Sequence, residues 1–284
     1  MTTIDDPRTL LKRYGLAAKK SWGQNFLVDE RIHAAIVAAG VASPRDWVVE
    51  IGAGLGTLTA RLADAVPEGK VIAVERDRDM VAVLEKELGA RANVEIRAEN
   101  ALTFDYTKIA ARAGGPVAVA GNLPYQIASP LLFTFLDARA HLRSATIMLQ
   151  KEMADRVLAE PGTSEYGALG VMLSLHLDVR PVITARAGAF FPAPKVDSTV
   201  VTLTPRATPR AVVDADRYRQ TVHAAFGQRR KTLRNALRSL WPTDAVDAAL
   251  GAAAIDGGRR GETLSVEEFA HLASALPEVH AGAS

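Results

Sequence analysis

The most specific chemical signal in this sequence is the segment Gly121-Asn122-Leu123-Pro124-Tyr125, which follows a short β-branched run. The Asn122 side-chain carbonyl and the Leu123 main-chain carbonyl can both accept hydrogen bonds from an exocyclic amine such as N6 of adenine. That nitrogen is a poor nucleophile because its lone pair is delocalised into the ring, and two acceptors would favour a tetrahedral, attacking geometry. Pro124 biases Leu123 to an extended conformation, and Tyr125 offers a flat face for stacking a base. The alternative interpretation is a plain turn.

A glycine-rich turn and two polar residues stand at the ends of three earlier strand-like runs. The turn is Gly52-Ala53-Gly54-Leu55-Gly56, and its glycines let the backbone approach a ligand closely. The dinucleotide fingerprint would need a third glycine where Thr57 stands, so the spacing fails for a pyrophosphate cofactor. Glu75 lies where an acidic residue accepts both ribose hydroxyls, and Asn100 follows the next run. Together these residues predict an adenosine site.

An alternation of strands and helices must position these motifs. The strand-like runs are Trp47–Ile51, Val71–Glu75, Val94–Ile96, Val117–Ala120, Thr146–Leu149, Val171–Val179 and Val200–Leu203, and the helical stretches between them include Leu58–Ala65, Asp79–Leu88 and Pro130–Arg139. This order predicts an α/β fold with a mostly parallel sheet and an antiparallel edge formed by the later strands. Ligands of such sheets bind outside the carboxyl ends of the strands, where the motifs fall.

The character of the chain changes after about residue 205. Thr204–Asp216 contains Pro205 and Pro209 and has the pattern of a linker, and beyond it only helical patterns appear, notably Tyr218–Leu240 and Val266–Leu276. We therefore expect a sheet domain over residues 19–205 and a small C-terminal all-α domain over residues 206–284. Residues 1–18 should form a basic arm that is disordered without RNA, and the chain should fray from Pro277 to Ser284.

Basic charge is concentrated in one segment. The chain of 284 residues has a net charge of +2, yet residues 206–238 hold nine basic side chains against two acidic ones. Clustered Lys and Arg favour a polyanion because they displace counterions from phosphates, although a solvated helix face is the alternative. The predicted RNA-binding residues are Arg229, Arg230, Lys231, Arg234 and Arg238. On one helix, Arg230, Arg234 and Arg238 would share a face, beside an apolar stripe that can dock on the sheet domain and comprises Phe226, Leu233, Leu237 and Leu240.

Composition excludes several other classes of protein. The absence of cysteine rules out disulfides, Cys-ligated zinc, iron–sulfur clusters and a thiol nucleophile. The six histidines show no metal-ligand spacing, so we expect no metal and interpret them as surface or satisfied core residues. With 48% hydrophobic and 23% charged residues, no apolar span of membrane length and no signal core, the chain should be a cytoplasmic protein that does not bind membranes. We expect a monomer.

Six segments together resemble the ribosomal RNA adenine dimethyltransferases, which use S-adenosylmethionine. They are Lys20–Leu27, Glu50–Gly56, Asn122–Tyr125, Ala189–Ser198, Phe226–Asn235 and Arg260–Ser265 with Phe269, so the resemblance covers about residues 19–276. It implies a Rossmann-like class I methyltransferase sheet. It also implies transfer of methyl groups to N6 of two adjacent adenosines in a hairpin loop near the 3′ end of 16S rRNA, within the small ribosomal subunit or its precursor, during small-subunit biogenesis.

The resemblance also implies roles for individual residues. The implied cofactor-binding residues are Gln24, Asn25, Leu27, Gly52, Gly54, Glu75, Asn100 and Asn122, and the implied catalytic residues are Asn122, Leu123, Pro124, Tyr125 and Phe190. The family usually has Asp where this chain has Asn100, whose carboxamide oxygen can still accept a hydrogen bond from the cofactor's adenine amine. Phe190 matches an aromatic residue that packs on the target base opposite Tyr125; its alternative role is a core aromatic.

Three other functions stay open. A methyltransferase that acts on large-subunit rRNA and confers macrolide resistance would have nearly the same sheet domain, and the segments Phe226–Asn235 and Arg260–Phe269 argue against it. A nicotinamide-dependent oxidoreductase is opposed by the position of Gly56 and by the lack of a hydride-transfer constellation. A non-catalytic RNA-binding factor that checks ribosome assembly is disfavoured by the intact Asn122–Tyr125 segment.

Overall fold

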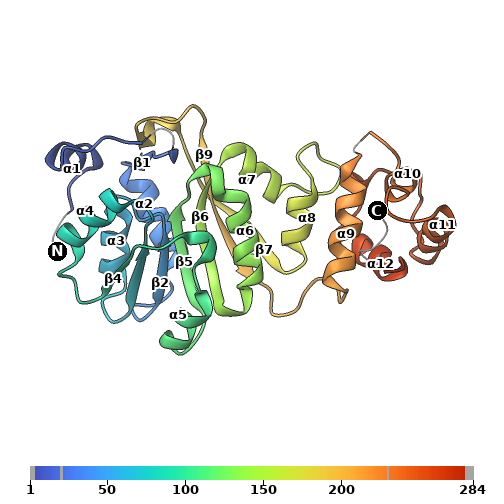
Figure 1. The fold of residues 1–284 in the computed structure, drawn as a ribbon, viewed down its shortest axis with the longest axis horizontal. Coiled ribbons are helices and arrows are strands. Elements are labelled where there is room, and N and C mark those ends of the chain that lie inside the picture. The colour runs from blue at the N-terminus through green and yellow to red at the C-terminus, as the bar shows by residue number, and fades with distance from the viewer. Residues whose placement is uncertain (1–3, 20–21, 229, 279–284) are drawn as a thin grey trace. The chain divides into compact units, whose positions relative to one another are not determined.

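The computed structural model describes residues 4–19, 22–228 and 230–278. They form two compact units. The first comprises the chain up to Ala154 together with Asp178–Pro205, and the second comprises Asp155–Leu177 together with the chain from Arg206 onward. Figure 1 shows the first unit as a twisted sheet with helices around it and the second as a group of helices.

The first unit is built on a seven-stranded sheet with the order β4-β3-β2-β5-β6-β9-β7. Its strands are β2 (Trp47–Ile51), β3 (Lys70–Val74), β4 (Val94–Arg97), β5 (Val117–Asn122), β6 (Leu142–Gln150), β7 (Leu177–Ala185) and β9 (Ser198–Pro205). The pairs from β4 through β6 are parallel, and β9 is antiparallel to β6. The predicted mostly parallel sheet with an antiparallel edge is therefore confirmed. A separate small sheet pairs β1 (Phe26–Leu27) with β8 (Phe190–Phe191).

Amphipathic helices cover this sheet. They are α2 (Glu30–Gly40), α3 (Thr57–Ala65), α4 (Arg78–Leu88), α5 (Tyr106–Ala113) and α6 (Ala128–Asp137), with short turns of 3-10 helix at η2 (Ala101–Thr103), η3 (Tyr125–Ile127), η4 (Arg139–His141) and η5 (Ala187–Ala189). Ile36 of α2 and Leu62 of α3 are fully buried and belong to one core cluster with Val48 and Ala118 of the sheet. Burial of these apolar faces fixes the helices against the sheet, and the sheet in turn positions the motifs at the ends of its strands.

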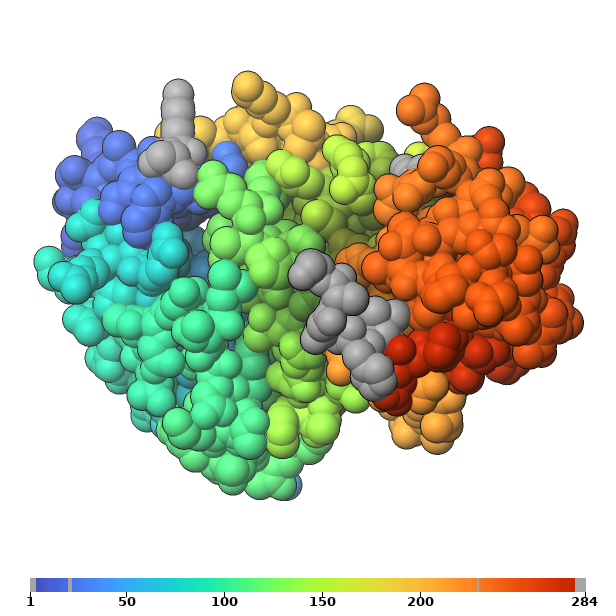
Figure 2. Space-filling model, turned by 45° about the vertical axis from the view of Figure 1, so that its right-hand side comes forward, coloured from blue at the N-terminus to red at the C-terminus, as the bar shows by residue number. Residues whose placement is uncertain are grey.

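The described part of the N-terminal stretch is not an extended arm, because it contains a helix that packs on the first unit. Helix α1 (Pro7–Arg13) buries Leu10 and Leu11 in a cluster with Met80 of α4, and Arg13 forms an ion pair with Glu87 at 2.8 Å. Figure 2 shows these N-terminal residues in blue beside the cyan segment that contains α4. The stretch is thus part of the first unit. Residues 1–3 lie outside the described part of the chain.

The second unit is helical, as predicted for the C-terminal region. Its elements are α8 (Ala168–Ser174), α9 (Ala215–Gly227), α10 (Leu233–Leu237), α11 (Thr243–Ala252), η6 (Gly261–Thr263) and α12 (Val266–Ala275), together with the second half of α7 (Lys151–Leu158). Helix α12 begins with a capping box in which Ser265 and Glu268 each accept a backbone hydrogen bond from the other, at 3.1 and 2.7 Å. No helix in the described ranges combines the length and apolar character that a membrane crossing needs.

The predicted strand Val171–Val179 is wrong over its first half, which forms α8. Val171 and Leu175, four residues apart, are buried in the core of the second unit, and the Tyr218 hydroxyl donates to the Val171 carbonyl at 3.2 Å. A short apolar run does not by itself distinguish a strand from a buried helix. Residues Asp155–Leu177, expected in the sheet domain, therefore cluster with the helical unit.

The predicted helix Tyr218–Leu240 is interrupted between Gly227 and Leu233. In the interruption, the Lys231 N–H donates to the Gln228 carbonyl at 2.8 Å. The apolar stripe also behaves differently from the prediction. Leu233 and Leu237 are fully buried in the core of the helical unit itself, with Phe226 packed against them, and Leu240 is 45% exposed. Leu233, Leu237 and Phe226 therefore stabilise the helical unit itself.

Candidate active site

A pocket lies at the carboxyl ends of β2 to β5, where β2 has β3 on one side and β5 on the other and the strand order reverses. This is the position at which open α/β sheets bind ligands. The predicted residues in its wall are Gln24, Asn25, Leu27, Gly52, Gly54, Glu75, Asn100, Asn122, Leu123, Pro124 and Tyr125. The structure thus brings together all of the predicted cofactor-binding and catalytic residues except Phe190.

Phe190 lies in the core of the first unit. It is 2% exposed on β8, pairs with Leu27 of β1 in the small sheet, and shares a cluster with Ala189. It does not belong to the pocket wall. Its burial matches the alternative role of a core aromatic, and its stacking on a base opposite Tyr125 stays a prediction.

The glycine-rich turn leaves room for a ligand against the backbone. Gly52 and Gly54 have φ of +71° and +54°, a region that favours glycine. A Cβ added at Gly52 would lie 3.5 Å from the Asn122 carbonyl oxygen and from Cδ of Pro124. A side chain there would therefore fill the space between the end of β2 and the end of β5.

The Glu75 carboxylate is held at the end of β3 by main-chain donors. Its Oε2 accepts from the N–H of Gly54 at 2.9 Å, and its Oε1 accepts from the N–H groups of Arg76 and Asp77, both at 2.7 Å. A carboxylate has about four lone-pair sites and these donors use three, so about one site is left for a hydroxyl donor from a ligand. Because the three donors are main-chain N–H groups, they fix the Glu75 carboxylate in a position from which it can accept from a ribose hydroxyl.

The Asn122 amide has a defined orientation. Its Nδ2 donates to the main-chain carbonyl of Asn25 at 2.8 Å. Only the NH2 end can donate to a carbonyl, so Oδ1 is an acceptor in the pocket wall that has no hydrogen-bond partner among the described residues. The next residue, Leu123, has a buried side chain, and Pro124 follows with φ −59°. The strand end therefore offers an amide oxygen fixed by a contact from 97 residues away.

Tyr125 is anchored at its far end. Its hydroxyl lies 3.0 Å from Oγ of Ser198, and burial raises its pKa, while the hydrogen bond with Ser198 opposes the rise. The phenol therefore stays protonated near neutral pH and cannot serve as a base. Its ring can serve as a flat surface in the pocket wall.

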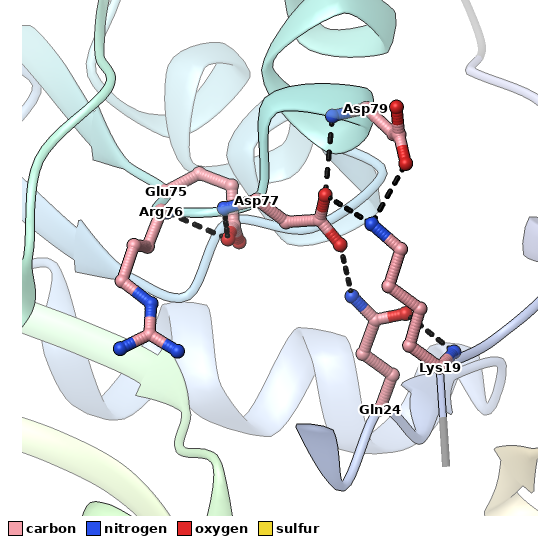
Figure 3. Close-up of polar contacts among 6 residues, drawn as sticks. All are labelled: Lys19, Gln24, Glu75, Arg76, Asp77 and Asp79. Carbon is pink, nitrogen blue, oxygen red and sulfur yellow. Dashed lines mark hydrogen bonds and ion pairs between the residues drawn. The ribbon is translucent and has the colours of Figure 1, made fainter. Parts of the chain in front are cut away.

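Both the oxygen and the nitrogen of the Gln24 amide form hydrogen bonds within the protein. Its Oε1 accepts from the N–H of Lys19 at 2.9 Å, and its Nε2 donates to Oδ2 of Asp77 at 2.8 Å. Figure 3 shows Asp77 also receiving hydrogen bonds from Nζ of Lys19, at 2.7 Å, and from the N–H of Asp79, at 3.1 Å. Burial raises the pKa of Asp77, but these hydrogen bonds outweigh it and hold the pKa below its usual value. Gln24 therefore holds its loop in place, while its amide keeps one N–H and one oxygen lone pair that these two contacts do not use, so its contact with a cofactor stays a prediction.

Asn100 also makes a contact within the protein. Its Oδ1 accepts from the N–H of Leu102 at 3.1 Å and caps η2. This is the oxygen that we expected to accept from an adenine amine. Among the described residues, the NH2 end of this amide has no hydrogen-bond partner, and the oxygen keeps a second lone pair, so its acceptance of a hydrogen bond from the adenine amine stays a prediction.

Glu50 is a buried acid in the pocket wall that sequence reasoning did not single out. It is 2% exposed, and burial raises its pKa to about 8, with the nearby Glu75 charge adding to the rise and Thr59 opposing it. Its Oε2 has no hydrogen-bond partner within the described ranges. A signal was present in the sequence, because Glu50 interrupts the apolar strand Trp47–Ile51 directly before the glycine turn.

His33 is the second residue that the sequence analysis missed. It is 1% exposed, lies in the pocket wall, and has Nε2 3.5 Å from Oγ1 of Thr57. Burial, with the Arg61 charge, lowers its pKa to about 4, so the ring is neutral. Its Nδ1 makes no hydrogen bond to any described residue, so it is not the satisfied core residue that we expected. In the described part of the chain, no group of His, Asp or Glu residues is suited to hold a metal ion.

The predicted RNA-binding residues do not form one helical face. Arg230 and Lys231 are exposed on the turn between α9 and α10. Arg234 is on α10, where its Nε forms an ion pair with Asp247 at 2.9 Å, and Arg238 ends that helix. Arg229 lies outside the described residues. Because α9 ends at Gly227, the spacing of Arg230, Arg234 and Arg238 does not place them on a single helix.

Sheet order and pocket together define a Rossmann-like methyltransferase. The same fold is found in the solved structure of a dimethyladenosine transferase from Plasmodium falciparum, which has a TM-score of 0.74 and 27% identity and covers 87% of this chain and 95% of its own. The chain belongs to the ribosomal RNA adenine dimethylase family, whose family model matches residues 15–277.

Relatives with established names agree with this assignment. Ribosomal RNA small subunit methyltransferase A of Myxococcus xanthus (strain DK1622) is 50% identical over 278 residues, which is 96% of both chains. The protein of the same name from Geobacter sulfurreducens (strain ATCC 51573 / DSM 12127 / PCA) is 43% identical over 92% of this chain and 96% of its own. Among solved structures, the 23S rRNA methyltransferase ErmE is also similar, with a TM-score of 0.68, 29% identity and coverage of 89% of this chain and 99% of its own.

Proposed function

We propose that this methyltransferase acts in the cytoplasm and transfers methyl groups from S-adenosylmethionine to N6 of two adjacent adenosines in a hairpin loop near the 3′ end of small-subunit rRNA. The observation that carries the proposal is the orientation of the Asn122 amide, whose Nδ2 is engaged at 2.8 Å and whose Oδ1 is free in the pocket wall. With the Leu123 main-chain carbonyl, this oxygen would accept from the target amine and localise its lone pair.

The pocket fits a cofactor with a ribose and a methionine tail. Glu75 would accept from the ribose hydroxyls, and the space that a Cβ at Gly52 would fill is available for the tail. When bound, S-adenosylmethionine supplies an activated methyl group on a sulfonium, whose charge is lost on transfer. The chain contributes alignment of the amine, and such orientation can lower a barrier by about 7–11 kcal/mol. Tyr125 would hold the base flat.

The RNA must present its adenine outside a duplex, because N6 is otherwise held in base pairing. A hairpin loop meets this requirement. The exposed Arg230 and Lys231 are suited to phosphate contacts, whereas Arg234 is already paired with Asp247. The family assignment and the pocket leave a nicotinamide-dependent oxidoreductase without support.

Mapping of methylated nucleotides tests the proposed function. The protein is incubated with S-adenosylmethionine and either small-subunit or large-subunit particles that lack the modification, and the RNA is analysed by mass spectrometry. We expect dimethyladenosine at two neighbouring positions near the 3′ end of the small-subunit RNA. Methylation of large-subunit RNA alone would indicate the other specificity, and no methylation of either particle would indicate a non-catalytic factor.

A further inference from the structure

A series of short contacts connects a buried acid outside the catalytic segment with the Asn122 amide. Oδ2 of Asp77 accepts from Nε2 of Gln24 at 2.8 Å. The next residue along the chain is Asn25, and its main-chain carbonyl accepts from Nδ2 of Asn122 at 2.8 Å. Asp77 is 2% exposed and follows β3, whereas Asn122 ends β5. The loop that carries Gln24 and Asn25 thus bridges the ends of two strands.

We propose that Asp77 and Gln24 are positioning residues for methyl transfer, because their hydrogen bond fixes the Asn25 carbonyl that sets the orientation of the Asn122 amide. Neither side chain needs to touch the substrate for this role. The proposal rests on the proposed function, in which the Asn122 oxygen accepts from the target amine.

The Asn25 carbonyl lies between two anchors. On its C-terminal side, Phe26 pairs with Phe191 in the two-stranded sheet. On its N-terminal side, the Gln24 side chain is fixed by Asp77 and by the Lys19 N–H, at 2.8 and 2.9 Å. Figure 3 shows that these contacts join the loop to the segment between β3 and α4. Without the Gln24 side-chain anchor, the N-terminal side keeps the hydrogen bond from the Gln24 N–H to the Lys19 carbonyl, at 3.4 Å, and the local one from Nδ2 of Asn25 to the Gly23 carbonyl, at 3.0 Å. Neither of these contacts joins the loop to the end of β3, so the peptide that presents the carbonyl to Asn122 is less firmly placed.

The orientation of the Asn122 amide decides what it offers to the substrate. An amide that turns over exchanges its oxygen for an NH2 group, which would face the target amine as a second donor. The Asn25 carbonyl prevents this by accepting from Nδ2. Small displacements of positioning groups can lower a rate by about a hundredfold. Loss of the hydrogen bond between Gln24 and Asp77 should therefore lower the rate of methyl transfer.

The proposal is tested by exchanging the amide and the carboxylate between positions 24 and 77. Each new side chain has nearly the same size as the one that it replaces. In Gln24→Glu, one oxygen can still accept from the Lys19 N–H, but the other faces the Asp77 carboxylate where a donor lies 2.8 Å away in the wild type. In Asp77→Asn, the oxygen that caps α4 can be kept, and the new NH2 faces the NH2 of Gln24. In the double variant, the new amide at position 77 can donate to the new carboxylate at position 24, so the hydrogen bond is restored with its direction reversed.

The measurement is the methyl-transfer rate at saturating S-adenosylmethionine and small-subunit particles, together with the KM for the cofactor. We expect each single variant to lose about tenfold to a hundredfold in kcat and the double variant to recover to within about threefold of the wild type. The matched control is Asp79→Asn, because Asp79 is 50% exposed and its carboxylate contacts Lys19 without reaching Gln24. Its kcat should stay within about twofold of the wild type.

Two results would overturn the proposal. One is a defect in the single variants that disappears at saturating cofactor, since the loop would then serve cofactor binding alone. The other is a double variant no more active than Gln24→Glu. If instead the wild type itself transfers no methyl group, the proposed function fails, and that outcome is separate from either of these.

Discussion

At the scale of single residues, the direction of two amides defines the chemistry of the pocket. Asn122 donates through Nδ2 to the Asn25 carbonyl and keeps its oxygen free, whereas Asn100 uses its oxygen to cap η2 and keeps its NH2 free of any described partner. The same side-chain type thus presents an acceptor at one point of the wall and a donor at another. The difference arises from which backbone group each amide meets.

Replacing Asn100 by Asp should strengthen cofactor binding. One carboxylate oxygen can keep the cap on the Leu102 N–H, and the other can accept from the adenine amine, where the wild type presents a donor. A hydrogen bond to a charged group contributes about 1.5–3 kcal/mol, so we expect at least about tenfold tighter binding of S-adenosylhomocysteine by calorimetry. The inosine analogue, with a carbonyl at position 6, is the control and should bind more weakly in the variant. Equal affinities for both ligands in both proteins would contradict this account.

Replacing Glu50 by Gln should change how stability depends on pH. The folded-state pKa of Glu50 is raised from 4.5 to about 8, so its contribution to stability is full below about pH 4.5 and is lost as the pH rises through about 8. Gln cannot titrate. The unfolding free energy of the variant relative to the wild type should therefore rise by roughly 1 kcal/mol per pH unit across this window. Denaturant unfolding at several pH values measures it, and parallel profiles would show that Glu50 is ionised in the folded protein.

At the scale of helices and strands, the sequence predicts an element or motif correctly where a short run of residues specifies it. Strands β2 to β6 and β9 lie where β-branched runs predict them, and the glycine turn and Asn122–Tyr125 fall at strand ends as expected. The hydrogen bond between Gln24 and Asp77 joins residues 53 positions apart, so no local pattern reports it. Helix α8 was missed because its apolar run is equally suited to a strand until Tyr218 packs on it.

The interruption between α9 and α10 separates the basic residues into two kinds. Replacing Arg230 and Lys231 by Ala should lower the dependence of RNA affinity on salt, by roughly 0.7–0.9 in the log–log slope for each lost phosphate contact. Arg234→Ala is the comparison, because Arg234 already pairs with Asp247 at 2.9 Å, and its slope should change less. Binding titrations at several salt concentrations measure these slopes. If Arg234→Ala lowered the slope as much as the double replacement, the turn would have no special role.

At the scale of the whole molecule, the chain forms two units, and each unit is built from two separate stretches of the sequence. Residues Asp155–Leu177 leave the sheet unit and contribute Tyr166, Val171 and Leu175 to the helical core before the chain returns to the sheet with β7. Composition suggested a boundary near residue 205. The two crossings on either side of Asp155–Leu177 could not be predicted, because they depend on which apolar surface covers α8.

A fragment that ends at Pro205 should therefore be poorly packed over residues 155–177. It would keep Val171 and Leu175 but lack Tyr218 and Phe269, which share their core. The exposed apolar surface should increase binding of a hydrophobic dye and make residues 155–177 sensitive to protease, relative to the full chain. A fragment that binds no more dye than the full chain and resists protease equally would show that these residues do not need the C-terminal helices.

Asn122→Ala decides whether the Asn122 oxygen accepts from the target amine. The measurement pairs the single-turnover rate of methyl transfer to small-subunit particles with the calorimetric affinity for S-adenosylmethionine. We predict a rate lowered by more than about a hundredfold and an affinity within about threefold of the wild type. Methyl transfer at the wild-type rate would contradict the account.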